Sequence, residues 1–143
     1  MSTKTNPVTF TFSYDCSKEK MWSAITRLDE MKVWYFDNID SFKPEVGSTS
    51  SFVIQHEGLT FTHLWEVLTM IPSKEISYSW RYQEYEGDGH VKFEIIEKNA
   101  ATQLTVINSG LETFPQHIPA FSRESCEAGW KYLLDMRLRE YLS

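Results

Sequence analysis

Five alternating segments between residues 42 and 109 constrain the fold of this chain most. In each segment apolar residues stand at every second position, which is the period of a β-strand with one buried face. When reversals are centred on Glu57-Gly58, Pro72-Ser73 and Asn99-Ala100, the apolar sets of the flanking strands meet. Because a shift of one residue would turn an apolar set outward, this agreement predicts antiparallel hairpins that share a single apolar face.

The predicted register is explicit enough to be checked. The facing pairs are Phe52 with His63, Ile54 with Phe61, Trp65 with Trp80, Val67 with Tyr78, Phe93 with Val106, and Ile95 with Leu104. A further strand is expected over residues 8–14, where apolar residues alternate with threonine and serine.

The last part of the chain changes from a period of two to a helical period. From Ile118 to Tyr141, apolar residues recur at spacings of three, four and seven. This pattern predicts an amphipathic helix of about 25 residues, with Pro119 in the first turn, where proline is tolerated. Two shorter helical segments are expected over residues 17–27, with Ser17 as N-cap, and over residues 28–36, which carry aromatic side chains inward.

These elements imply one arrangement. The sheet has one apolar face and the long helix has one apolar stripe, so each must bury against the other. A flat sheet would leave the helix ends uncovered, and we therefore expect the sheet to curl. The sequence thus predicts an α+β fold in which a curved antiparallel sheet wraps a long C-terminal helix. The length of 143 residues, without linker or repeat, predicts one domain over residues 1–143.

Composition argues against several kinds of partner. The formal net charge is −6 and no cluster of lysine and arginine stands out, which argues against nucleic acid and against a membrane surface. No apolar run opens the chain and none is long enough for a membrane helix, so we expect a cytoplasmic protein. Cys16 and Cys126 belong to no Cys/His cluster; two free thiols are expected, with one disulfide as the alternative.

Several short motifs resemble those of a known family. They are Lys20-Met21-Trp22-Ser23-Ala24-Ile25, Trp34, Glu45-Val46-Gly47, Tyr78-Ser79-Trp80 at the end of the stretch that begins at Trp65, and Gly129-Trp130 followed by Leu133, Leu134 and Tyr141-Leu142. Their order along nearly the whole chain resembles the family named after the activator of the heat-shock-protein-90 ATPase, within the START-like or SRPBCC group. The resemblance implies the helix-grip fold, also called Bet v-like, with a cavity between the sheet and the last helix.

The fold implied by this resemblance carries many functions, including ligand carriers, hormone receptors, cyclases and co-chaperones. The chain departs from the family pattern at Trp65, where we expect a smaller residue. This tryptophan predicts a narrower cavity, which the side chain of Trp65 or of Trp130 could fill.

Aromatic residues make up 15% of the chain, which suits either a thick core or a cavity wall. We expect a cavity that binds an apolar small molecule, such as a lipid or an aromatic compound. The residues expected to contact this ligand are Trp34, Phe52, Ile54, His63, Trp65, Tyr78, Trp80, Tyr82, Phe93, Val106, Phe114, Trp130 and Leu133. Phe114 and Pro115, in the loop before the long helix, are also expected to form a lid over one end of the cavity.

Two other functions stay open. One is a stress-response module that binds a chaperone, as the family name implies. The other is a cyclase-like or hydrolase-like enzyme in which His63 and Tyr82 handle protons. The enzyme ranks last because no convergent acid, base and nucleophile is present, and no catalytic residue is predicted. No histidine has metal-ligand spacing and no phosphate-binding glycine loop precedes a helix, so neither metal nor cofactor is expected.

Overall fold

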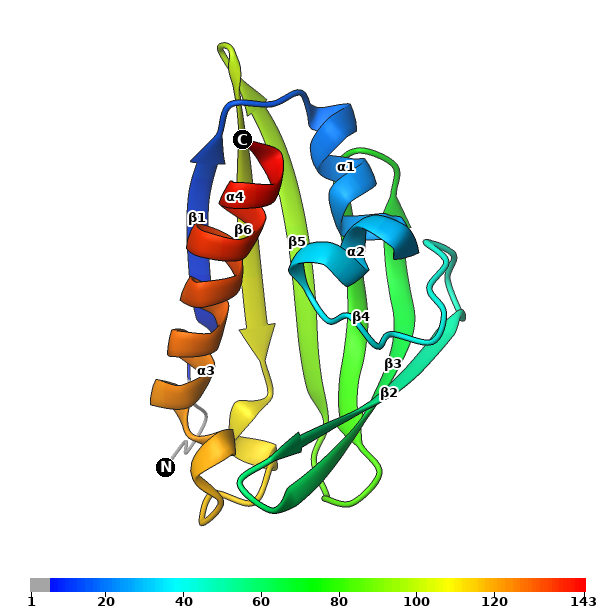
Figure 1. Ribbon diagram of the computed structural model, residues 1–143, viewed down its shortest axis with the longest axis vertical. Helices are drawn as coiled ribbons and strands as arrows, with labels where there is room; N and C mark the ends of the chain where they lie inside the picture. Colours follow the sequence, from blue (N-terminus) through cyan, green and yellow to red (C-terminus); the bar gives the residue numbers. More distant parts are fainter. Residues whose placement is uncertain (1–5) are drawn as a thin grey trace.

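The computed structural model describes residues 6–143; the prediction that the chain opens without a signal peptide falls largely on residues 1–5, outside this range. The elements in order are β1 (Val8–Tyr14), α1 (Lys18–Thr26), α2 (Leu28–Trp34), β2 (Thr49–His56), β3 (Leu59–Ile71), β4 (Glu75–Tyr82), β5 (Gly89–Lys98), β6 (Ala101–Ser109), η1 (Leu111–Thr113), η2 (Pro119–Phe121), α3 (Arg123–Lys131), η3 (Tyr132–Leu138) and α4 (Arg139–Leu142). The strands form a six-stranded antiparallel sheet in the order β1-β6-β5-β4-β3-β2. The helices lie over one face of this curved sheet (Figure 1), which confirms the predicted α+β helix-grip fold.

The predicted strand register is confirmed in all three hairpins. The observed pairs include Phe52 with His63, Trp65 with Trp80, and Phe93 with Val106. The turn between β3 and β4 differs in detail, because Ile71 pairs with Glu75 and the turn is therefore one residue longer than predicted. An unpaired residue in β3, Leu68, shifts the register by one and compensates for the longer turn.

The two short helices form where the sequence predicts them. The Oγ atom of Ser17 accepts a hydrogen bond from the backbone N–H of Lys20 at 3.1 Å, which confirms Ser17 as the N-cap of α1. Trp34, at the end of α2, is completely buried, and its indole Nε1 donates to the carbonyl of Ala24 at 2.8 Å. This bond holds α2 against α1 and directs the residues after Trp34 into the space above the sheet.

The long helix begins at Arg123 rather than at Ile118. Ser122 has an extended backbone, and its hydroxyl accepts a hydrogen bond from the backbone N–H of Ser125 at 3.1 Å. Serine is among the best N-cap residues, so the chain enters the helix there. Pro119 lies instead in the short 3-10 helix η2, and the segment before Ser122 is free to cover one end of the sheet.

The middle of the long helix, η3, is a π-helix that keeps one apolar row on the sheet. The residues buried at every fourth position are Trp130, Leu134, Leu138 and Leu142. In an α-helix a row with this spacing drifts around the axis, and the wider π turn reverses the drift. The hydroxyl of Tyr14 in β1 donates to the carbonyl of Leu134 at 2.7 Å, which gives that carbonyl a partner outside the helix.

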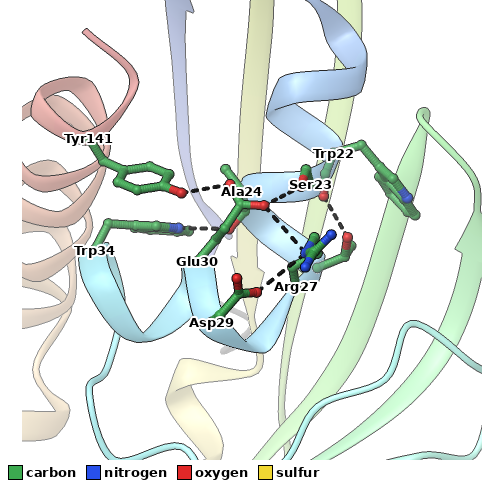
Figure 2. A network of polar contacts seen from close by, with 9 residues as sticks. Trp22, Ser23, Ala24, Arg27, Asp29, Glu30, Trp34 and Tyr141 are labelled. Atoms are coloured by element: carbon green, nitrogen blue, oxygen red, sulfur yellow. Dashed lines mark hydrogen bonds and ion pairs between the residues drawn. The ribbon is translucent and has the colours of Figure 1, made fainter.

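Polar contacts tie the short helices to the end of the long helix (Figure 2). Glu30 of α2 accepts hydrogen bonds from the hydroxyl of Ser23 in α1 and from the hydroxyl of Tyr141 in α4, the second at 2.7 Å. Arg27 lies 3.3 Å from a carboxylate oxygen of Asp29 and 3.7 Å from one of Glu30. These contacts hold together the end of the fold where α1, α2 and α4 meet.

Candidate ligand-binding site

A cavity of about 160 Å³ lies between the sheet and the first half of the long helix. Its wall comes from β4, β6, α3, η3, the segment that contains η1 and η2, and Phe36, which follows α2. The lining residues are Phe36, Trp80, Tyr82, Asn108, Leu111, Phe114, Ala120, Phe121, Cys126, Gly129, Trp130 and Leu133. The wall is mainly aromatic and aliphatic and only partly encloses the space. An engineered cavity of about 150 Å³ in another protein binds benzene, so a single ring fits this volume.

The structure divides the residues expected to contact a ligand into two groups. Those that line the cavity are Trp80, Tyr82, Phe114, Trp130 and Leu133. Those outside its lining are Trp34, Phe52, Ile54, His63, Trp65, Tyr78, Phe93 and Val106. Apart from the half-buried Ile54, the second group is buried in the packed interior.

Two aromatic side chains that follow α2 explain this division. Tyr35 is buried, stacks on Trp34 with ring centroids 4.7 Å apart, and lies 5.3 Å from Trp65 and 5.9 Å from Trp130. Its hydroxyl lies 2.9 Å from the hydroxyl of Tyr78 on the sheet. Phe36 lies beside Tyr35, at 4.9 Å between ring centroids. These rings fill the middle of the space between sheet and helix and leave a cavity at one end.

Sequence reasoning missed some lining residues that a pattern could have revealed. Asn108 stands two positions beyond Val106 and four beyond Leu104, so it belongs to the inward set of the same strand. It is 7% exposed, as this parity requires. Phe121 was assigned to the long helix, whereas η2 places it against Phe114, with ring centroids 5.3 Å apart. No pattern distinguishes such a loop position in advance.

Asn108 organises the polar groups on one side of the cavity. Its Oδ1 accepts hydrogen bonds from Nε1 of Trp130 at 3.1 Å and from Sγ of Cys126 at 3.0 Å. Its Nδ2 donates to the carbonyl of His90 at 2.9 Å. Burial raises the pKa of Cys126 to about 11, so the thiol is protonated at neutral pH.

On the opposite wall, Trp80 and Tyr82 form a second polar pair. The indole Nε1 of Trp80 donates to the hydroxyl oxygen of Tyr82 at 2.8 Å. Burial raises the pKa of Tyr82 well above its usual value. The hydrogen bond from Trp80 lowers this pKa, but by less than burial raises it. The hydroxyl of Tyr82 is therefore protonated at neutral pH.

Phe114 covers one end of the cavity and rests on a glycine-rich loop. A Cβ atom on Gly87 would lie 2.2 Å from Cδ1 of Phe114, and one on Gly89 would lie 3.0 Å from Cε2 of the same ring. The backbone N–H of Asp88 also donates to the hydroxyl of Thr113 at 2.8 Å. The two glycines thus form the seat of the Phe114 ring, and the role of Phe114 as a lid stays a prediction.

Replacing Gly87 with alanine should displace the Phe114 ring and open the cavity. Gly87 has a φ of 138°, which strains any residue with a side chain, and the new methyl group would overlap the ring. We expect a loss of about 1–3 kcal/mol in the free energy of unfolding. In a Cys16→Ser background, a thiol reagent should also modify Cys126 faster than in the parent protein.

Gly58→Ala is the matched control for this substitution. Gly58 also has a positive φ, 79°, but a Cβ atom there would meet nothing within 4 Å. It should lower stability through backbone strain alone and leave the modification rate of Cys126 unchanged. Equal rates for the Gly87→Ala and Gly58→Ala proteins would contradict a lid role for Phe114.

His63 lies inside the fold but outside the cavity lining. It is 5% exposed and stacks on Phe52, with ring centroids 4.4 Å apart. Its Nδ1 lies 3.1 Å from the carbonyl of Phe61 and must carry the proton, because a carbonyl only accepts. Burial lowers the pKa of His63 to about 4, against the opposite effects of the Phe61 carbonyl and of Glu84. This placement does not favour the enzyme hypothesis.

Residues 6–143 also bear on metal binding, on disulfide formation and on membrane insertion. No group of three or more histidine, cysteine, aspartate or glutamate residues in this range could hold a metal ion. Both cysteines are free thiols, as expected. None of the helices described is long and apolar enough to cross a membrane.

Solved structures share this fold at low sequence identity. The Mll3558 protein from Rhizobium loti has a TM-score of 0.82 at 19% identity and covers 95% of this chain and 96% of that chain. The CV1439 protein from Chromobacterium violaceum has a TM-score of 0.77 at 18% identity, with 96% of each chain covered. DynU16, from the dynemicin biosynthetic locus, has a TM-score of 0.75 at 19% identity, with 96% of this chain and 47% of that chain covered.

The family of the chain follows from its sequence. None of the curated proteins compared with the chain matches it. The sequence profile of the Activator of Hsp90 ATPase homolog 1-like proteins matches residues 15–143, a range that contains every element from α1 to α4. The resemblance found in the short motifs is thereby confirmed, and the chain belongs to the family of Activator of Hsp90 ATPase homolog 1-like proteins.

Proposed function

We propose that this protein binds a small apolar molecule in the cavity at the start of the long helix. The supporting observation is a mainly aromatic and aliphatic wall around space that the protein's own side chains do not fill. Burial of apolar surface contributes about 25 cal/mol per Å², so one ring gains several kcal/mol before the entropy cost of binding. The proposed contacts are the expected residues that line the cavity, namely Trp80, Tyr82, Phe114, Trp130 and Leu133.

The size of the cavity and one structural neighbour bear on this proposal. Sites for drug-sized ligands usually measure about 300–1,000 Å³, so a volume of about 160 Å³ favours a smaller molecule over a long lipid. DynU16 comes from a biosynthetic locus, which agrees with a protein that handles a small molecule.

Gly129 provides a direct test, because it lines the cavity and has room for a side chain. A Cβ atom at this position would meet no other atom within 4 Å. Gly129 is exposed, so it stands at the open side of the cavity, and the other lining residues of the long helix, Cys126, Trp130 and Leu133, lie on the same side of the helix. Gly129→Leu should therefore place its side chain over this opening and weaken ligand binding at least about tenfold, through the obstructed space rather than through misfolding. Gly129→Ala is the matched control: it should keep binding and add about 1 kcal/mol of helix stability.

The measurement is native mass spectrometry of the three proteins purified from their own host, followed by extraction of any bound molecule. A bound mass in the parent and Gly129→Ala proteins, absent from Gly129→Leu, would support the proposal. Retention of the same mass by Gly129→Leu would place the ligand elsewhere. If the parent protein carries no molecule, toluene and acetophenone are titrated by NMR, and a lack of binding of both contradicts the proposal.

A chaperone partner is the second candidate function. It is favoured by membership of a family named after an activator of the Hsp90 ATPase. A groove lined in part by Val33 and Tyr132, which are 51% and 48% exposed, also offers apolar surface on the helical side. Its direct test is the ATPase rate of Hsp90 with and without the purified protein, and an unchanged rate counts against it.

A further inference from the structure

The cavity wall contains no charged side chain. Every lining residue is apolar or uncharged, and burial keeps both Cys126 and Tyr82 protonated at neutral pH. An ion that entered this space would lose hydration without meeting an opposite charge, which costs several kcal/mol. The wall therefore discriminates against anions and cations alike.

The two side-chain oxygens on the wall, Oδ1 of Asn108 and the hydroxyl oxygen of Tyr82, already accept hydrogen bonds from protein donors. Trp130 only donates, so the atom it meets at 3.1 Å must be the amide oxygen of Asn108, which also accepts from Cys126. The carbonyl of His90 only accepts, so it must meet the amide nitrogen of Asn108. These partners fix the orientation of the amide and turn its oxygen to protein donors rather than to a ligand.

The hydroxyl of Tyr82 is the clearest remaining polar group, and it is a donor. Its oxygen accepts from Trp80 at 2.8 Å, but among the described residues no acceptor takes its proton. A hydroxyl that accepts one hydrogen bond becomes a better donor for another. Because Tyr82 lines the cavity, its hydroxyl can donate a hydrogen bond to a ligand there, whereas the side-chain oxygens of the wall are already paired as acceptors.

We propose that the ligand is an uncharged molecule about the size of one substituted ring, with a hydrogen-bond acceptor that receives the proton of the Tyr82 hydroxyl. This inference rests on the proposed binding function and specifies the chemistry of its ligand. A carbonyl, ether or nitrile group meets the requirement. A carboxylate fails because of its charge, and a pure hydrocarbon leaves the Tyr82 donor without a partner.

Four probes of the same shape separate these properties. Acetophenone, cumene, benzoate and benzamidine share a ring and a Y-shaped substituent, and they are respectively a neutral acceptor, a hydrocarbon, an anion and a cation at neutral pH. Each is titrated into the ¹⁵N-labelled protein by NMR. The indole N–H signals of Trp80 and Trp130 report on the cavity, and that of Trp34, bound to Ala24 in the interior, is the internal reference.

Tyr82→Phe is the decisive variant, because it removes the donor and keeps the ring. We expect it to weaken the binding of acetophenone about three- to tenfold, the usual range for one net hydrogen bond, and to change the affinity for cumene less than about twofold. Trp80→Phe keeps the Tyr82 hydroxyl but removes the hydrogen bond that strengthens it as a donor, so it should weaken the binding of acetophenone more than that of cumene, by a smaller factor than Tyr82→Phe does. The carbonyl stretch of bound acetophenone should lie at lower frequency in the parent protein than in Tyr82→Phe. Benzoate and benzamidine should bind at least about tenfold more weakly than acetophenone.

The outcomes separate this inference from the function on which it rests. Equal losses for acetophenone and cumene in Tyr82→Phe would overturn the role of the hydroxyl. Binding of benzoate or benzamidine as tight as that of acetophenone would overturn the requirement for a neutral ligand. In both cases the cavity still binds small molecules. If no probe, cumene included, moves the Trp80 and Trp130 signals, the proposed function itself fails.

Discussion

Replacing Trp65 with alanine should lower the free energy of unfolding by about 3–5 kcal/mol, the range typical of large aromatic residues removed from a core. Trp65 is 2% exposed, and its ring lies 4.7 Å from that of Tyr78, 4.9 Å from Phe52 and 5.2 Å from Trp80. These neighbours belong to the sheet and cannot move together to fill the space. Urea unfolding followed by circular dichroism measures the loss. A loss below about 1 kcal/mol would mean that Trp65 bounds a ligand space rather than the core.

Trp65→Phe is the informative comparison, because it keeps a ring in the same place. The indole Nε1 of Trp65 is buried without a hydrogen-bond partner among the described residues. An unpaired buried donor costs about 1–3 kcal/mol, and phenylalanine removes this cost while it leaves a smaller void than alanine. We therefore expect Trp65→Phe to be much milder than Trp65→Ala. Equal losses for the two variants would mean that the indole N–H has a stabilising partner and that the lost bond, rather than packing, sets the size of the effect.

Trp65 also shows which part of the fold the sequence could predict. Its partner Trp80 was predicted because strand periodicity and turn position agree on one register, and a one-residue error would expose the whole apolar face. Even the β3–β4 turn, which is longer than predicted, keeps this pair because the bulge at Leu68 restores the register. Burial of one face thus determines the pairing more strongly than the turn does. The start of the long helix was less predictable, since Ser122 competes with the apolar periodicity that begins at Ile118.

The candidate site was predictable only in part, because parity reports which face a side chain is on but not what lies above it. Trp80 and Trp65 lie on the same face of the sheet and pair with each other across neighbouring strands. Nevertheless, Trp80 lines the cavity and Trp65 does not. The difference comes from Tyr35 and Phe36, which enter from a connection between elements. No periodic pattern constrains such a connection, so the position of the cavity along the helix emerges only from three-dimensional packing.

Lowering the pH from 6.5 to about 4 should remove about 3 kcal/mol of stability through His63 alone. The pKa of this imidazole falls from 6.5 to about 4 because burial disfavours the cation. Between these values the unfolded chain binds a proton that the folded chain does not, so stability falls as the pH falls. Well above pH 6.5 the imidazole is neutral in both states and its contribution is complete. The difference between the two pKa values corresponds to about 1.4 kcal/mol for each pH unit.

His63→Phe isolates this effect, because phenylalanine keeps a ring against Phe52 and has no proton to bind. The quantity to measure is the slope of the free energy of unfolding against pH. The absolute stability of the variant is not informative, because the larger ring alters packing. Carboxylates that do not interact with His63 contribute equally to both proteins and cancel in the difference, whereas the interaction of His63 with Glu84 is lost together with the imidazole. Parallel slopes for the parent and His63→Phe proteins between pH 6.5 and 4 would show that water or a charge reaches His63 and that this side of the interior is open.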